Sequence, residues 1–186
     1  MRLEWIVIAI AAVVGLYAVI VFNRLVRSRN LVREAWSGID VQLRRRSDLV
    51  PNLVEAVKGY ASHERALFAD IATKRTSAMT ATDVPGKAAA EGDLQGSLRR
   101  LMALAESYPE LKANQNFLTL QNQLAELEDE LQMARRYYNG TVRDYNIGIQ
   151  SFPEVLLAGL TGFHEQYFFQ ADEGARVTPS VSFQAS

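Results

Sequence analysis

The fold of this chain is decided by residues 32–60, VREAWSGIDVQLRRRSDLVPNLVEAVKGY. Apolar side chains recur in this stretch in alternating steps of four and three residues, which places them along one face of an α-helix. The single polar interruption is an arginine, and the stretch therefore predicts a long helix with one buried face. The positions of this first stripe are Val32, Trp36, Ile39, Leu43, Arg46, Val50, Leu53, Val57 and Tyr60.

A second stripe with the same period begins at residue 113 and continues through Ile149 and Phe152. Asn139 and Gly140 form a turn signal inside it, but the period outweighs that signal and predicts a continuous helix. No strand-like alternation precedes residue 170, so we expect an all-α fold. An N-terminal transmembrane helix should continue into an elongated antiparallel helical bundle with long helices. The stripe comprises Ala113, Phe117, Leu120, Leu124, Leu127, Leu131, Ala134, Tyr138, Thr141 and Tyr145.

Three prolines mark bends and helix starts. Pro51 lies inside the first stripe, where it removes one backbone hydrogen bond, and we expect a continuous helix with a kink there. Pro109 and Pro153 each follow a serine by two residues and precede a glutamate, an arrangement that suits the first turn of a helix. A last short helix should begin near Pro153 and point these side chains inward: Val155, Leu156, Leu157 and Leu160.

The beginning of the chain predicts a membrane anchor. Residues 6–22 carry no charge, and counting Leu3 and Trp5 the apolar span covers twenty residues, or roughly 30 Å of helix. The alternative is a cleaved secretory signal. Its apolar region is usually only about 7 to 15 residues long and ends in a small-x-small cleavage site, which is missing here. We therefore expect a retained single-pass anchor over residues 1–23.

Four arginines follow the anchor directly: Arg24, Arg27, Arg29 and Arg33. The positive-inside bias places the large domain in the cytoplasm. Anionic lipid head groups would attract such residues by about 1 kcal/mol each. A nucleic-acid site is not predicted, because this basic patch lies against the bilayer.

The remaining organisation is simple. Residues 24–169 are long enough for one helical domain with a single core. Residues 76–93 contain Pro85, Gly86 and Gly92 and are predicted to form an exposed loop. Residues 170–186 change character, since apolar residues alternate there, and they are predicted to form an extended or disordered tail.

No reactive centre is predicted. Cysteine is absent, and His63 and His164 lack metal-ligand spacing. Nucleophile-elbow and phosphate-loop motifs are also missing, so we expect no enzyme, cofactor, metal or small-molecule substrate. One acidic run is interpreted as a solvated helix face: Glu126, Glu128, Asp129 and Glu130.

Several polar and aromatic residues exceed what a minimal bundle needs. Arg46 occupies a core-facing position and requires a partner, because an unpaired buried charge costs several kcal/mol. Asp48 and Pro51 lie beside it. We expect these residues to fix packing and register, with a partner-binding patch as the alternative. The second cluster comprises Arg135, Arg136, Tyr137, Tyr138, Asn139, Tyr145 and Asn146.

Several motifs of this chain resemble the LemA family. They are Ala35-Trp36, DLVPNLV at 48–54, YPELKAN at 108–114, ARRYYN at 134–139 and PSVSF at 179–183. The resemblance implies a protein of the bacterial cell membrane, the inner membrane in a two-membrane cell, with one span, a helical-bundle domain and no assigned enzymatic activity. A magnetosome-associated branch of the family points to membrane organisation, and the shared ending favours an ordered tail.

Two functions fit these observations. The first is a membrane-anchored scaffold that forms homo-oligomers and organises or shapes the bilayer. The alternative is an adaptor or regulator that presents its helical domain or tail to another membrane protein, such as a membrane peptidase.

Overall fold

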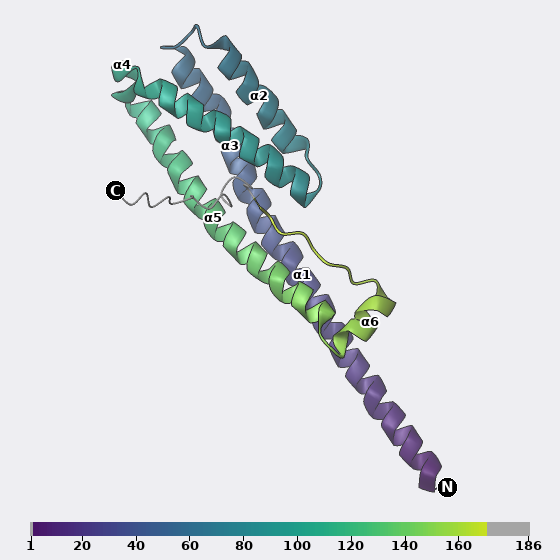
Figure 1. Ribbon diagram of the computed structural model, residues 1–186. Helices are drawn as coiled ribbons and strands as arrows, with labels where there is room; N and C mark the ends of the chain where they lie inside the picture. Colours follow the sequence, from purple (N-terminus) through teal and green to yellow (C-terminus); the bar gives the residue numbers. More distant parts are fainter. Residues whose placement is uncertain (1, 171–186) are drawn as a thin grey trace, which may run out of the picture. The chain divides into compact units, whose positions relative to one another are not determined.

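The computed structural model describes residues 2–170, which form helices and no strand (Figure 1). The all-α fold expected from the sequence is confirmed. The helices in the described residues are α1 (Arg2–Lys58), α2 (Arg65–Thr80), α3 (Val84–Glu106), α4 (Pro109–Lys112), α5 (Gln115–Gln150) and α6 (Glu154–Thr161).

The first stripe lies on α1, a single helix that contains Pro51 without a break. Its predicted continuity is therefore confirmed. Stripe positions from Val32 to Val57 are buried, except that Trp36 is half-buried. Tyr60, which was assigned to the same stripe, lies beyond the end of the helix and is exposed. The four-three period thus located the buried face of α1 correctly, including Arg46.

The second stripe lies on α5, which continues through Asn139 and Gly140 as predicted. Its two ends were wrong. Ala113 is exposed and separates the single turn of α4 from α5, because the Asn114 side chain caps a new helix there. The side-chain oxygen of Asn114 accepts hydrogen bonds from the backbone N–H of Asn116 at 2.9 Å and of Phe117 at 3.2 Å. Phe152 lies beyond the last turn of α5 and is exposed.

The predicted exposed loop over residues 76–93 is also wrong. Residues 76–80 complete α2, and α3 begins at Val84. The Asp83 carboxylate caps α3 by accepting a hydrogen bond from the N–H of Gly86 at 2.7 Å, and Pro85 occupies a first-turn position. A Cβ atom at Gly86 would lie only 3.1 Å from that carboxylate, so glycine permits the close cap. Residues read as loop signals therefore start a helix.

The described residues divide into two units. Unit 2 comprises Leu43–Asp129 together with residues 169–170, and within it α2 and α3 lie side by side (Figure 1). Its core is formed by aliphatic and aromatic residues from α1, α2, α3, α4 and α5. The buried members are Leu49, Val50, Leu53, Val57, Ala61, Phe68, Ile71, Ala78, Leu94, Leu98, Leu101, Ala105, Leu111 and Phe117.

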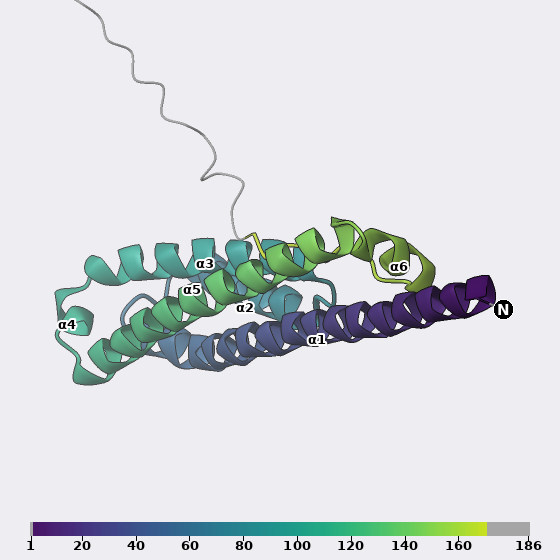
Figure 2. The ribbon, with the colours of Figure 1, turned by 90° about the horizontal axis from the view of Figure 1, so that it is seen from below.

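Unit 1 comprises residues 2–42 and Glu130–Phe168. In it α5 runs antiparallel beside α1 (Figure 2). Trp36 of α1 packs on Tyr138 of α5 with ring centroids 5.4 Å apart. Nearer the anchor, Phe22 meets Phe163, which follows α6, in an edge-to-face contact at 5.8 Å. Residues nearer the start of α1 thus contact residues later in the chain, as antiparallel packing requires.

Helix α6 forms where the sequence predicted it, but its orientation was predicted wrongly. Val155, Leu156 and Leu160 are exposed, whereas Ala158 is the residue of α6 that is buried. Gly162 ends the helix in the left-handed conformation, with φ of 73°, which glycine adopts without steric cost. Residues 163–170 are not helical. The tail prediction falls on residues 171–186, which lie outside the described part of the chain.

Candidate functional site

The first twenty residues of α1 present their apolar side chains outward. The large apolar side chains from Leu3 to Ile20 and that of Phe22 are exposed, and only 6% of the most apolar 18-residue window is buried. By length and composition, α1 is the one helix of the described residues that could cross a membrane. The core of unit 1 begins at Val21 and Leu25, which are buried. The predicted anchor therefore ends where the packing of unit 1 starts.

The four arginines after the span are placed differently from one another. Arg24, Arg27 and Arg33 are exposed, whereas Arg29 is half-buried. The Arg29 guanidinium lies 4.8 Å from the ring centroid of Phe163, within cation–π range. An Arg24 guanidinium nitrogen lies 3.4 Å from a carboxylate oxygen of Glu154, at the start of α6. Their predicted role, attraction to anionic lipid, stays a prediction.

Arg46 lies at the centre of a buried ion cluster in unit 2. Its guanidinium pairs with Glu91 of α3, and it also donates to Glu128 of α5 at 2.6 Å. The side chains of Arg46 and Glu91 are 1% and 3% exposed, so neither charge is solvated by bulk water. Burial alone would lower the pKa of Arg46, but the carboxylates of Glu91 and Glu128 more than offset it and raise the pKa. Three helices thus meet at one cation.

Sequence reasoning found the cation but missed its partners. Glu91 fell in the supposed loop, and Glu128 was assigned to a solvated face although it is only partly exposed and paired. The arginine at a buried position of the stripe indicated that a carboxylate partner exists. Helical periodicity does not say which distant carboxylate meets it. Asp48 and Pro51, which flank the arginine in sequence, are exposed.

The second predicted cluster splits into an inner and an outer face of α5. Tyr138 and Tyr145 are among the largest fully buried side chains. Burial raises the pKa of both phenols; at Tyr145 the positive charges of Arg29 and Arg33 act against this shift. The full set divides into buried Arg135, Tyr138 and Tyr145, half-buried Asn139 and Asn146, and exposed Arg136 and Tyr137.

The inner face of α5 holds the segment that follows α6. The Tyr138 hydroxyl donates to the carbonyl of Tyr167 at 2.9 Å. The Asn146 amide makes a reciprocal pair with the backbone of Gln166: it donates to the carbonyl and accepts from the N–H, both at 2.9 Å. These bonds satisfy main-chain groups that no helix or strand satisfies. Asn146 therefore acts as a clamp for residues 166–167.

Replacing Asn146 by alanine should release this segment. Loss of two hydrogen bonds, each worth about 0.5 to 1.5 kcal/mol, is expected to lower local stability by about 1 to 3 kcal/mol. Amide hydrogen exchange at Gln166 should accelerate accordingly, while exchange in the centre of α3 stays unchanged. Tyr138→Phe is the matched control, since it removes a single bond to the neighbouring carbonyl. Unchanged exchange at Gln166 in the Asn146→Ala protein would rule out the clamp.

The comparison with protein families identifies the chain. The model of the LemA family matches residues 35–183, which include the core stripe of α1 from Trp36 onward and all of α2 to α6. The chain belongs to the LemA family. The match begins after the anchor and the four arginines, so it rests on the helical units. Within residues 2–170 of this LemA-family chain, no group of three metal-ligating side chains comes together.

Several curated proteins are similar to this LemA-family chain over most of its length. Magnetosome protein MamQ 2 of Paramagnetospirillum magneticum is 28% identical, over 96% of this chain and 75% of that protein. Magnetosome protein MamQ of Magnetospirillum gryphiswaldense is 26% identical, over 78% and 64% of the two chains. Protein LemA of Metamycoplasma hominis is 28% identical, over 86% and 74%. Together with the exposed apolar helix, this family membership makes the chain a membrane-associated protein.

Proposed function

We propose that this chain is a membrane-anchored helical scaffold that assembles with copies of itself and organises the bilayer, without catalysing a reaction. Its large domain would lie in the cytoplasm, at the bacterial inner membrane, as the arginines after the span favour. Relatives that carry the name magnetosome protein support a role in organising a cellular structure. Family membership supports the membrane location.

One observation carries the proposal: the anchor and the first core helix of unit 1 are the same helix. α1 continues from the exposed apolar residues into the buried positions Val32, Ala35 and Ile39 without a turn or linker. A flexible tether would suit a protein that only needs to stay near a membrane. A continuous helix instead transmits force between the bilayer and the packed unit, which is what a scaffold requires.

The outer face of α5 supplies a surface for self-assembly. Met133 and Tyr137 are four residues apart and exposed, and Arg136 lies next to them. Two apolar side chains at this spacing lie on one face of a helix. Tyrosine and arginine are the residue types that contribute most to protein interfaces. Met133 and Tyr137 are 53% and 54% exposed, so about half of each side chain is available to a partner.

The proposal predicts large assemblies of the full-length protein. In mild detergent, mass photometry should detect oligomers, and electron microscopy of the protein in lipid should detect ordered arrays or bent membranes. Tyr137→Ala with Met133→Glu should dissociate them, whereas an Arg143→Ala variant, changed at an exposed residue on the same helix, should assemble normally. A protein that stays monomeric at every concentration would contradict self-assembly.

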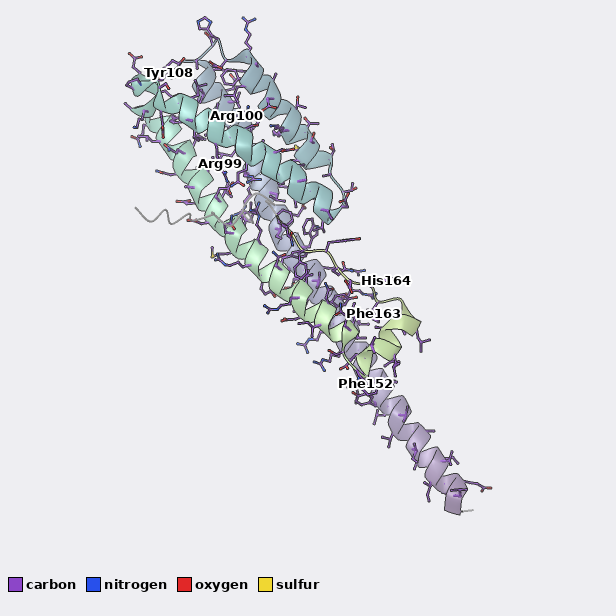
Figure 3. The ribbon with its side chains drawn as sticks, viewed as in Figure 1. Arg99, Arg100, Tyr108, Phe152, Phe163 and His164 are labelled. Atoms are coloured by element: carbon purple, nitrogen blue, oxygen red, sulfur yellow. The ribbon has the colours of Figure 1, made fainter. Side chains whose placement is uncertain are left out.

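An adaptor is the second candidate, and a groove in unit 2 favours it. The groove has a volume of about 380 Å³ and lies between α3 and α5. Leu98, Met102 and Leu124 line it together with charged Arg99 and Glu106. Figure 3 shows Arg99 on α3. An apolar floor with charged edges suits a helical or extended segment of another membrane protein.

Site-specific photo-crosslinking separates the two candidates. A photoreactive amino acid at Tyr137 should give crosslinks between identical chains if the scaffold proposal holds. The same amino acid at Arg99 should give a stoichiometric crosslink to a different membrane protein if the adaptor proposal holds. Ser62, an exposed residue in the connection after α1, is the reference position for nonspecific crosslinks.

A further inference from the structure

Helix α6 has an unusual surface for a helix at the edge of a folded unit. Its sequence, EVLLAGLT, carries one charge, yet the apolar side chains of Val155, Leu156 and Leu160 point outward. Leu156 is 60% exposed and Leu160 is 84% exposed; they are four residues apart and lie on one side of the helix. Phe152, immediately before the helix, is 81% exposed. A contiguous apolar patch of this kind marks an interaction site.

The patch lies at the end of the membrane span. Glu154, the first residue of α6, pairs with Arg24, the first charged residue after the apolar run. Phe163, just beyond α6, packs on Phe22, the last residue of that run, and lies under Arg29. These contacts occupy residues 22–29 of α1, which cover about 10 Å along the helix axis. The interfacial layer on each side of a bilayer core is about 5 to 8 Å thick.

Both ends of α6 meet the same short stretch of α1. Glu154 contacts Arg24, and Phe163 contacts Phe22 and lies under Arg29. The ribbon in Figure 1 gives the direction of the helix, which runs across α1 and not along it. Figure 1 shows this crossing, and Figure 3 shows Phe152 at the turn between α5 and α6, beside α1. With α1 crossing the bilayer, α6 therefore lies close to the membrane plane.

The charge of α6 and its location beside the span favour lipid as the occupant of the patch. The single carboxylate of α6 is mostly covered and is paired with Arg24, so no unpaired charge of α6 opposes entry into lipid. The apolar side chains before Phe22 already require a hydrocarbon environment, and the α6 patch continues that surface sideways. Lipid is present at this level wherever the anchor is inserted, whereas a protein partner would have to be recruited.

We propose that Phe152 and α6 form an interfacial helix whose apolar side chains enter the boundary between head groups and acyl chains, in the leaflet where α1 leaves the membrane. The inference rests on the anchoring in the proposed function but requires no self-assembly. An insertion into one leaflet expands that leaflet alone, so each copy acts as a small wedge. Such helices respond to membrane curvature.

The absence of cysteine from the chain permits a direct test with single-cysteine variants of the full-length protein. Leu160→Cys and Phe152→Cys would each carry an environment-sensitive NBD fluorophore in vesicles of phosphatidylcholine and phosphatidylglycerol. Leu16→Cys is the reference inside the span. Val41→Cys is the matched control, because it is also an exposed apolar residue but lies about 25 Å past Arg24 along the same helix, α1.

The labels at Leu160 and Phe152 should emit at shorter wavelength than the label at Val41. They should also lose most of their intensity when the lipids carry bromine near the head-group end of the chain. Emission at both sites that matches the Val41 label, with the Leu16 label quenched, would overturn the interfacial helix while the anchor stands. A blue shift without quenching by brominated lipid would also overturn it, since protein would then cover the patch. An unquenched Leu16 label would overturn the anchoring and the inference together.

Labels at two positions, Phe152 and Leu160, control for a single variant that fails to fold. Circular dichroism should show the same helix content for each labelled protein as for the unlabelled chain. Because Phe152 and Leu160 are largely exposed, neither replacement removes core packing. Agreement between the two positions is the expected result, and lipid contact at neither of two folded variants is the result that contradicts it.

Discussion

Replacing Arg46 by leucine is expected to destabilise unit 2 by about 3 to 5 kcal/mol. The loss comes from the carboxylate left behind, because Glu91 remains buried without the cation that pairs with it. Glu128 is more exposed and can turn toward water, so it contributes less. Urea denaturation of the full-length protein in detergent, followed by circular dichroism, would show the midpoint shifted to lower urea concentration.

A second variant separates the unpaired charge from lost packing. Arg46→Leu combined with Glu91→Leu removes both buried charges and should recover most of the lost stability, since apolar replacement of a buried ion pair is often neutral or stabilising. Asn52→Leu changes an exposed residue on the same helix and should stay within about 0.5 kcal/mol of the unchanged protein. If Arg46→Leu alone folds and assembles normally, the ion cluster does not fix the register of α1, α3 and α5.

The second large effect concerns the anchor. Ile10→Asp together with Val14→Asp is expected to prevent membrane integration of most of the protein. Each aspartate at the centre of a span costs about 2.5 to 3.5 kcal/mol on the insertion scale. The aliphatic residues and Phe22 of this span contribute about 4 to 7 kcal/mol altogether on the same scale. Two charges therefore offset the whole favourable term.

Extraction with alkaline carbonate measures this outcome. The unchanged protein should stay with the membrane pellet, and the doubly substituted protein should move to the supernatant. Ile10→Leu with Val14→Leu is the matched control and should remain in the pellet. Both positions are exposed side chains that precede the first buried residues of unit 1, Val21 and Leu25, so the helical domain should fold in every variant. Retention of the aspartate variant in the pellet would mean that another part of the chain holds it there.

The helices themselves could be predicted because period alone determines a buried face. The α1 stripe has its buried side chains where the four-three spacing puts them, even at Arg46 and across Pro51. Local rules failed where tertiary packing outweighs propensity. Pro85, Gly86 and Gly92 were interpreted as a loop, yet Asp83 caps α3 and the apolar residues of that helix pack in the core.

The sequence did not predict which distant residues form ion pairs, or whether an outward-facing side chain meets water or lipid. Nothing local distinguishes Glu128 from its acidic neighbours, and only the fold brings it to Arg46. The error at α6 has a different cause. Leu156 and Leu160 were expected to face a protein core because apolar side chains avoid water, whereas beside a membrane span an outward position does not imply water.

In the membrane-anchored scaffold that we propose, the uninterrupted passage of α1 from its apolar end into the packed part of unit 1 would couple the orientation of that part to the thickness of the bilayer. A span that is too long for a thin membrane relieves the mismatch by tilting. With no joint between the span and the buried positions around Ile39, that tilt must swing unit 1 through the same angle. Membranes of different composition would then present the outer face of α5 at different inclinations to neighbouring molecules.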